Sequence, residues 1–177
     1  MRLIALALLC ALPFPAFAAG SNDSTPPDTT KTTTECKKGT VWDEKTKACI
    51  AADGALINDD QRFEAARELA YFGREDEALQ MLALMTEGET DRVMTYKGFA
   101  LRKSGHVEEG IAAYDRALAL NPDNILARSY YGQLFVEMAE PELAMAQLTE
   151  IRARGGAGTW AETSLASAIE TGTTYSN

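Results

Sequence analysis

The sequence predicts an all-α domain: three pairs of antiparallel helices stacked as a solenoid and closed by a C-terminal capping helix. A disordered linker and a small cysteine-bridged β-hairpin are predicted to precede it. Three observations predict this fold. From Asp59 onward, the helix-forming residues Ala, Leu, Met, Glu and Arg dominate. Small residues recur there at a regular spacing, as they do in repeat proteins. Two cysteines, Cys36 and Cys49, stand close together before this region.

Residues 1–18 have the pattern of a secretory signal peptide. Arg2 precedes an unbroken apolar run, and Ala16-Phe17-Ala18 ends the run with a small-x-small cleavage signal. The run is short for a helix that must cross about 30 Å of hydrocarbon. We therefore expect a bacterial-type export signal, a periplasmic or secreted protein, and no stable membrane span after signal cleavage. An uncleaved N-terminal anchor is the alternative.

Charge excludes one class of partner. Without residues 1–18 the chain has 16 Lys and Arg against 26 Asp and Glu, a net charge of -10. A chain this acidic repels phosphate backbones, so we expect no nucleic-acid binding.

Residues 19–35 read AGSNDSTPPDTTKTTTE and contain no apolar side chain larger than Ala or Pro. Such a segment cannot bury enough apolar surface to offset its ordering entropy. We therefore expect a disordered linker.

Residues 36–50 are predicted to form a disulfide-closed hairpin. Cys36 and Cys49 are the even pair that remains in the exported chain, and an even count there favours a disulfide. A zinc site would need further ligands, and the single histidine, His106, is far along the chain. Val41-Trp42 and residues 48–50 are expected to pair as short strands.

The spacing G-x-x-W-D-x-x-T-x-x-C in this hairpin resembles part of small extracellular carbohydrate-binding modules of the chitin-binding type. The match is confined to the stretch from Cys36 to Cys49 and lacks the additional cysteines of those modules. The resemblance implies a glycan-binding surface with Trp42 as a stacking platform. The alternative is that the disulfide-closed hairpin has only a structural role at the end of the linker.

Residues 59–158 divide into three units. Gly98 recurs as Gly132, and Leu101 recurs at the same spacing as Phe135. Going backward, Gly98 corresponds to Ala66 at a slightly smaller spacing, so the first unit is the shortest. The predicted units are 59–90, 91–124 and 125–158.

The second unit reads DRVMTYKGFALRKSGHVEEGIAAYDRALALNPDN. Its marker residues are Gly98, Leu101, Gly105, Gly110, Tyr114, Ala117, Asn121 and Pro122. This pattern resembles the tetratricopeptide repeat family over residues 59–158, although no unit has the first-helix Trp of that family and Gly110 replaces the usual Ala. The resemblance implies an adaptor whose first helices line a concave groove that binds extended peptides.

Each unit also places one small residue in each helix, where two antiparallel helices approach closely. In the first helices these residues are Ala66, Gly98 and Gly132, and in the second helices Ala78, Gly110 and Ala144. The larger Leu82, Tyr114 and Leu148 are expected to fill the space beside them. A glycine costs up to about 1 kcal/mol of helix propensity relative to Ala, so packing must offset it.

After the third unit, residues 155–158 interrupt the helical pattern with three glycines. Residues 159–170 are predicted to form a capping helix, with Trp160, Leu165 and Ile169 on the face that covers the last unit. Residues 171–177 are expected to be a tail.

The resemblance implies that the groove is lined by side chains of the first helices. The candidate partner site is Arg67, Tyr71, Arg92, Phe99, Arg102, Lys103 and Gln133. Arginines among aromatic rings favour a protein or peptide partner with an acidic segment. The alternative is an ordinary solvated helix face.

The sequence contains no Ser-His-Asp order, no H-E-x-x-H motif, no phosphate-binding glycine loop and no EF-hand loop. We therefore expect a non-catalytic protein with no cofactor and no metal.

Overall fold

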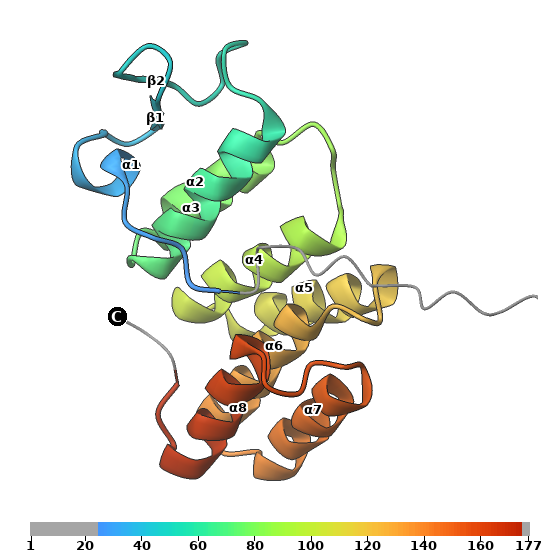
Figure 1. The fold of residues 1–177 in the computed structure, drawn as a ribbon. Helices are drawn as coiled ribbons and strands as arrows, with labels where there is room; N and C mark the ends of the chain where they lie inside the picture. Colours follow the sequence, from blue (N-terminus) through green and yellow to red (C-terminus); the bar gives the residue numbers. More distant parts are fainter. Residues whose placement is uncertain (1–24, 175–177) are drawn as a thin grey trace, which may run out of the picture.

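A computed structural model describes residues 25–174 of the chain (Figure 1). The predicted signal peptide, residues 19–24 of the predicted linker and residues 175–177 of the predicted tail lie outside the described residues. The elements, in chain order, are α1 (Lys31–Thr34), β1 (Thr40–Asp43), β2 (Ala48–Ala51), α2 (Asp59–Tyr71), α3 (Glu75–Ala83), α4 (Asp91–Lys103), α5 (Val107–Leu120), α6 (Ile125–Glu137), α7 (Pro141–Ala153) and α8 (Trp160–Thr171).

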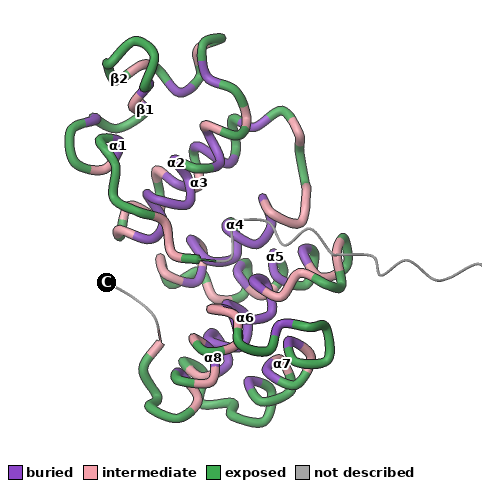
Figure 2. The backbone as a smooth tube through the Cα atoms, viewed as in Figure 1, coloured by how far each residue is buried: buried purple, intermediate pink, exposed green. Residues whose placement is uncertain are grey.

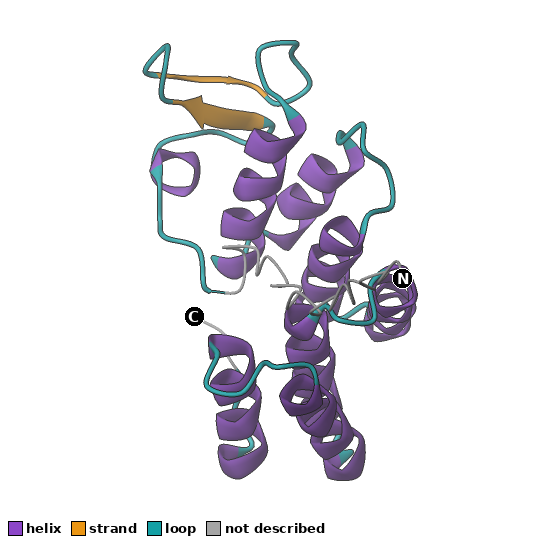
Figure 3. Ribbon diagram, turned by 45° about the vertical axis from the view of Figure 1, so that its right-hand side comes forward, coloured by secondary structure: helices purple, strands orange, loops and turns teal. Residues whose placement is uncertain are grey.

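Consecutive helices pack in pairs: α2 with α3, α4 with α5, and α6 with α7. Each later pair rests on the one before it, since α4 contacts both α2 and α3 and α6 contacts both α4 and α5. The final helix, α8, packs on α6 and α7. The pairs follow one another from the hairpin end of the molecule to α7 and α8 (Figure 1 and Figure 3). The mostly helical fold predicted for this part of the chain is confirmed.

The same turn closes all three pairs. Gly73 and Gly105 take the left-handed backbone conformation after α2 and α4, and Ala139 takes it after α6, with φ of 76°, 85° and 58°. In each turn the N–H of the next residue donates to the carbonyl five positions earlier at 2.8 Å, which satisfies an otherwise orphan helix carbonyl. Ala139 bears a steric cost that the two glycines avoid.

Two of the predicted notch glycines lie under large side chains. A Cβ added at Gly98 would lie 2.8 Å from two ring atoms of Tyr114, so the predicted Gly98–Tyr114 contact is confirmed. At Gly132 the neighbour is Leu165 of α8, whose Cδ2 would lie 2.5 Å from an added Cβ. The expectation that Leu148 of α7 is the side chain at this notch is therefore corrected: the capping helix fills it.

The predicted hairpin and disulfide are confirmed. β1 and β2 pair antiparallel with Trp42 opposite Cys49, and Cys36 and Cys49 are bonded. Asp43 shapes the turn, because its carboxylate accepts from the N–H and the hydroxyl of Thr46, both at 2.8 Å. Val41 of this hairpin joins the same buried cluster as Phe63 of α2. The hairpin therefore contributes to the same core as the first helix pair.

The prediction of a disordered linker is wrong for residues 25–35, which we call the strap. This segment contains α1 and lies against α2. Thr32 of the strap is buried, and Thr30 and Thr33 donate to the carboxylate of Glu68 in α2. The composition argument failed because polar contacts with a side chain far along the chain, not buried apolar surface, order the strap.

Burial follows the pairing of the helices (Figure 2). The first helices of the pairs are buried over most of their surface, and in α6 every residue from Leu126 to Phe135 is buried. The second helices α3, α5 and α7 expose one face. Within residues 25–174, no helix combines the length and the apolar character needed to cross a membrane.

Candidate partner-binding face

One aromatic ring from each of four helices, α2, α4, α6 and α8, forms a continuous row. The ring centroids of Phe63 and Tyr96 are 5.4 Å apart, and those of Tyr96 and Tyr130 are 5.9 Å apart. Trp160 continues the row at 5.9 Å from Tyr130. All three contacts are edge-to-face, an arrangement that the ring quadrupole favours. We call these four rings the aromatic row, and the side of α2, α4, α6 and α8 that carries them the inner face.

A second set of rings lies beside the row. Tyr71, at the end of α2, stacks on Phe99 of α4 with centroids 5.9 Å apart and planes 5° apart. Phe99 in turn contacts Tyr130 at 4.7 Å. The inner face thus contains six aromatic side chains from four helices.

Arg67 lies between the first two rings of the row. Its Nε donates to the Tyr96 hydroxyl at 3.1 Å, and its guanidinium carbon lies 6.0 Å from the centroid of Phe63 and 5.6 Å from that of Tyr96. Glu64 accepts from Nη1 at 2.8 Å. Burial opposes the charged form of Arg67, but Tyr96 and Glu64 outweigh it and raise the pKa of Arg67 above its ordinary value. The guanidinium is therefore a fixed positive charge on the inner face.

Arg92 and Arg102 are also held by carboxylates. Arg92 pairs with Glu87 at 2.6 Å and Asp60 at 2.9 Å, and its side chain is 31% exposed. The Arg102 side chain is fully buried, pairs with Glu137 at 3.2 Å and donates to the backbone carbonyl of Tyr130 at 2.8 Å. Both arginines tie consecutive helix pairs together.

Tyr130 and Gln133 bring polar atoms to the α6 part of the inner face. The Tyr130 hydroxyl is fully buried. Burial, and then the neighbouring Tyr96, raise the pKa of Tyr130 well above its ordinary value. Gln133 is fully buried and donates to the hydroxyl of Ser164 in α8 at 3.0 Å.

Some of the predicted site residues contact the aromatic row: Arg67 and Arg92 lie beside Phe63, and Phe99 contacts Tyr130. The expectation of an open groove is corrected, because most of the predicted residues are buried. Five of them are buried: Arg67, Tyr71, Phe99, Arg102 and Gln133. Arg92 and Lys103 are half-buried. These residues mostly join helices to each other, because a repeat unit must use its first helix for packing on both neighbouring pairs.

The aromatic row was missed as a set. Phe63, Tyr96 and Tyr130 follow one another along the chain at close to the spacing from Gly98 to Gly132, and Trp160 comes slightly earlier than that spacing would place it. The signal for it in the sequence is an aromatic residue that recurs in each unit at nearly the spacing of the glycines.

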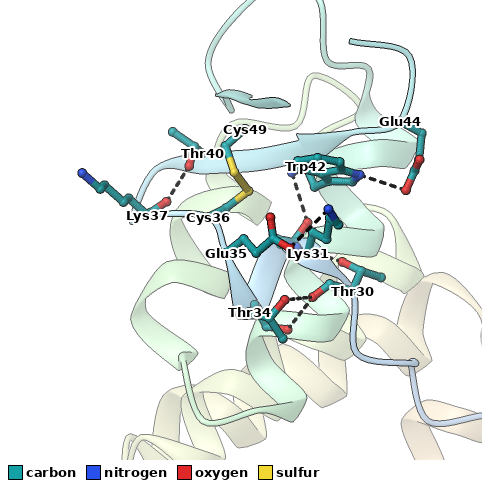
Figure 4. Close-up of a disulfide and its surroundings, with 12 residues drawn as sticks. Thr30, Lys31, Thr34, Glu35, Cys36, Lys37, Thr40, Trp42, Glu44 and Cys49 are labelled. Atoms are coloured by element: carbon teal, nitrogen blue, oxygen red, sulfur yellow. Dashed lines mark hydrogen bonds and ion pairs between the residues drawn. A yellow bond between two sulfur atoms is a disulfide. The ribbon is translucent and has the colours of Figure 1, made fainter. Parts of the chain in front are cut away.

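Trp42, the predicted stacking platform of the hairpin, is half-buried, and it lies near Glu44 and Lys31 (Figure 4). Its Nε1 donates to Glu44 at 2.9 Å, and the ammonium group of Lys31 lies 4.3 Å from the ring centroid. Lys31 of the strap therefore covers one face of this ring.

Compared with protein-family models, the chain matches none, and searches among curated proteins and solved structures found no match either. In the part of the chain that the structure describes, no cluster of three or more His, Cys, Asp or Glu residues could hold a metal ion.

Proposed function

We propose that this chain is a non-catalytic protein-interaction module, a tetratricopeptide-like solenoid that binds an extended segment of a partner protein across its inner face. Two features support the solenoid: the identical turn that closes all three helix pairs, and the contact of Gly98 with Tyr114. The Cys36–Cys49 disulfide suits an oxidising compartment, so the proposed location is the periplasm or the outside of the cell.

The aromatic row is the observation that carries the proposal. Its rings are 5.4–5.9 Å apart. Alternate side chains of an extended polypeptide are about 6.6 Å apart along the strand. Phe63, Tyr96 and Tyr130 are at most 1% exposed, whereas Trp160 is half-buried, so a partner segment reaches the first three rings only when the side chains that cover them move. Such a segment would place one side chain near each repeat, and aromatic residues are the ones that contribute most at protein interfaces.

Charge plays a smaller part in this proposal than in the sequence analysis. Arg67, Arg92 and Arg102 each already pair with a carboxylate of this chain. A partner carboxylate would compete with these internal pairs. We therefore assign the affinity to ring contacts and to polar backbone groups of the partner, and an acidic partner segment is not required.

The two tryptophans of the chain provide a matched test. A photo-crosslinking amino acid is placed at position 160, on the inner face, or at position 42, on the hairpin, and each protein is irradiated in an envelope extract. The proposal predicts a partner that is captured from position 160 and not from position 42. It also predicts that Trp160→Ala weakens binding of that partner by at least about tenfold.

Far-UV circular dichroism of the Trp160→Ala protein controls for folding. The proposal fails if the folded Trp160→Ala protein keeps its affinity, or if positions 160 and 42 capture the same proteins. A glycan-binding function of the hairpin makes the opposite prediction: binding to insoluble glycan is lost in Trp42→Ala and kept in Trp160→Ala.

A further inference from the structure

The strap is held on α2 by hydrogen bonds from its backbone and its side chains. One carboxylate, that of Glu68, accepts from the backbone N–H of Thr30 at 2.6 Å and of Thr33 at 3.3 Å. It also accepts from the Thr30 hydroxyl at 2.6 Å and from the Thr33 hydroxyl. Glu68 is only 3% exposed, and hydrogen bonds to a buried charge are the strong ones.

Two arginines bind carbonyl groups of the same strap. Arg74 donates to the carbonyls of Thr32 at 3.3 Å and of Thr33 at 3.2 Å. Arg67 donates from Nη2 to the carbonyl of Thr25 at 3.0 Å. Donors and acceptors of the strap are thus both recognised by side chains at the C-terminal half of α2 and the turn after it.

The contact at Arg67 places the start of the strap on the inner face. The Arg67 guanidinium is the group that lies beside Phe63 and Tyr96, the first two rings of the aromatic row. A partner segment that runs the full length of the row must reach these rings. It would meet the Thr25 carbonyl at Arg67.

The other end of the strap is held covalently. Thr32 accepts from the N–H of Trp42 in β1 at 3.2 Å, and Cys36 is bonded to Cys49 in β2 (Figure 4). The hairpin also contacts α2, because Gln61 donates to Asp43 at 3.5 Å. A segment tethered this closely has a high effective concentration at its site, so it competes well even when its own contacts are few.

We propose that the strap is a built-in competitor for the inner face. Its Thr25 carbonyl occupies Arg67, which lies beside the first two rings of the aromatic row, the Glu68 contacts keep it there, and a partner segment gains full access to Arg67 only by displacing it. The displacing group is a carbonyl or carboxylate that takes the place of the Thr25 carbonyl at Arg67. This inference rests on the proposed function of the inner face.

The test is made on the purified chain without any partner. Thr30→Val combined with Thr33→Val keeps the side-chain shape but removes both hydroxyl donors to Glu68. Thr34→Val is the matched control, since the Thr34 hydroxyl donates to the Thr30 carbonyl and not to Glu68. Release of the strap is measured by trypsin cleavage after Lys31. Opening of the inner face is measured by the rate at which phenylglyoxal modifies Arg67, with the exposed Arg116 as internal standard.

The proposal predicts that the double variant is cleaved after Lys31, and modified at Arg67, at least about tenfold faster than the wild type. Thr34→Val should behave as the wild type. If Arg67 stays unreactive when Lys31 becomes cleavable, the strap does not cover the inner face and the proposal is overturned. Continued protection of Lys31 in the double variant also overturns it, because the Glu68 contacts then do not hold the strap.

If circular dichroism shows that the double variant is unfolded, the single Thr30→Val variant is measured in the same way, since it keeps the Thr33 donors. The Arg67 rate does not depend on any partner, whereas the cross-linking from position 160 does. A negative result for the strap therefore does not contradict the proposed function. Failure to find a partner does not change the result for the strap.

Discussion

Substitution of Gly98 by Ala measures how closely α4 and α5 approach. An added Cβ would lie 2.8 Å from Cδ1 and Cε1 of Tyr114 and 3.0 Å from its Cζ, so the ring has to move. The ring has little room to do so. Tyr114 is fully buried and stacks on Tyr131 at 5.3 Å, which itself stacks on Phe135 at 4.4 Å.

The change in the free energy of unfolding for Gly98→Ala follows from two opposing effects. Replacing glycine by alanine inside a helix contributes about 1 kcal/mol of helix propensity. Overpacking a close-packed core costs about 1–3 kcal/mol, and a clash with several atoms of a fixed ring belongs at the upper end. The free energy of unfolding should therefore fall by about 1–2 kcal/mol.

Urea unfolding followed by far-UV circular dichroism provides the assay. The second protein of the comparison is Gly98→Ala with Tyr114→Leu, because Leu82 and Leu148 stand at the equivalent positions of the other units. Removal of the ring should relieve the clash, so the two substitutions together should cost less than the sum of their separate effects, with a coupling of about 1 kcal/mol or more.

An increase in stability for Gly98→Ala alone would refute this packing. That is the result expected for a glycine on an uncrowded helix surface, where only propensity counts. Additive effects of the two substitutions would likewise mean that residues 98 and 114 do not touch.

Three further predictions concern single features of the fold. Replacing Cys36 and Cys49 by Ala should lower the free energy of unfolding by up to about 3 kcal/mol, measured by urea unfolding, and a reducing agent should then have no further effect. Ala139→Gly should raise the unfolding free energy by about 1 kcal/mol, because glycine takes the left-handed conformation at this turn without steric cost; a loss of stability would contradict the observed turn. Burial, and then the neighbouring Asp115, raise the pKa of Tyr131 to about 12. The stability due to this shift is complete below the ordinary tyrosine pKa of about 10 and is lost as pH rises toward 12, so Tyr131→Phe should unfold with a weaker alkaline dependence.

The repeat could be predicted from sequence because its cause is local and periodic. A notch such as Gly98 has to recur wherever a pair of helices approaches closely, so its spacing along the chain reveals the pairs. The Cys36–Cys49 bond followed from the count of two cysteines that remain when residues 1–18 are left out. The first inference needs only the spacing of small residues along the chain, and the second needs only the number of cysteines.

Contacts between distant segments could not be predicted in this way. Nothing in the composition of residues 25–35 indicates that Glu68, far along the chain, would order them. The neighbour of Gly132 was missed for a related reason: the repeat alignment points to Leu148 in its own unit, whereas the capping helix contributes Leu165. The last pair has no fourth pair to rest on it, so its packing departs from the periodic pattern.

Candidate site residues could be chosen from the sequence, but their burial could not be predicted from it. Offsets from the repeat selected Arg67, Phe99 and Gln133, which make contacts between helices in the structure. They could not show that these side chains are buried, because burial there depends on how α8 and the strap cover the units. Two of the arginines also pair with carboxylates of other helices, Arg92 with Asp60 and Arg102 with Glu137.

The claim on which the fold and the proposed function both depend is that small residues mark the helix contacts. Nuclear Overhauser effects in the isotope-labelled protein test it directly. The structure predicts strong effects between the Hα protons of Gly98 and the ring protons of Tyr114, and between the Hα protons of Gly132 and the methyl groups of Leu165. Absence of both effects from a folded sample would contradict the stacked helix pairs, and an effect from Gly132 to Leu148 alone would contradict the position of α8.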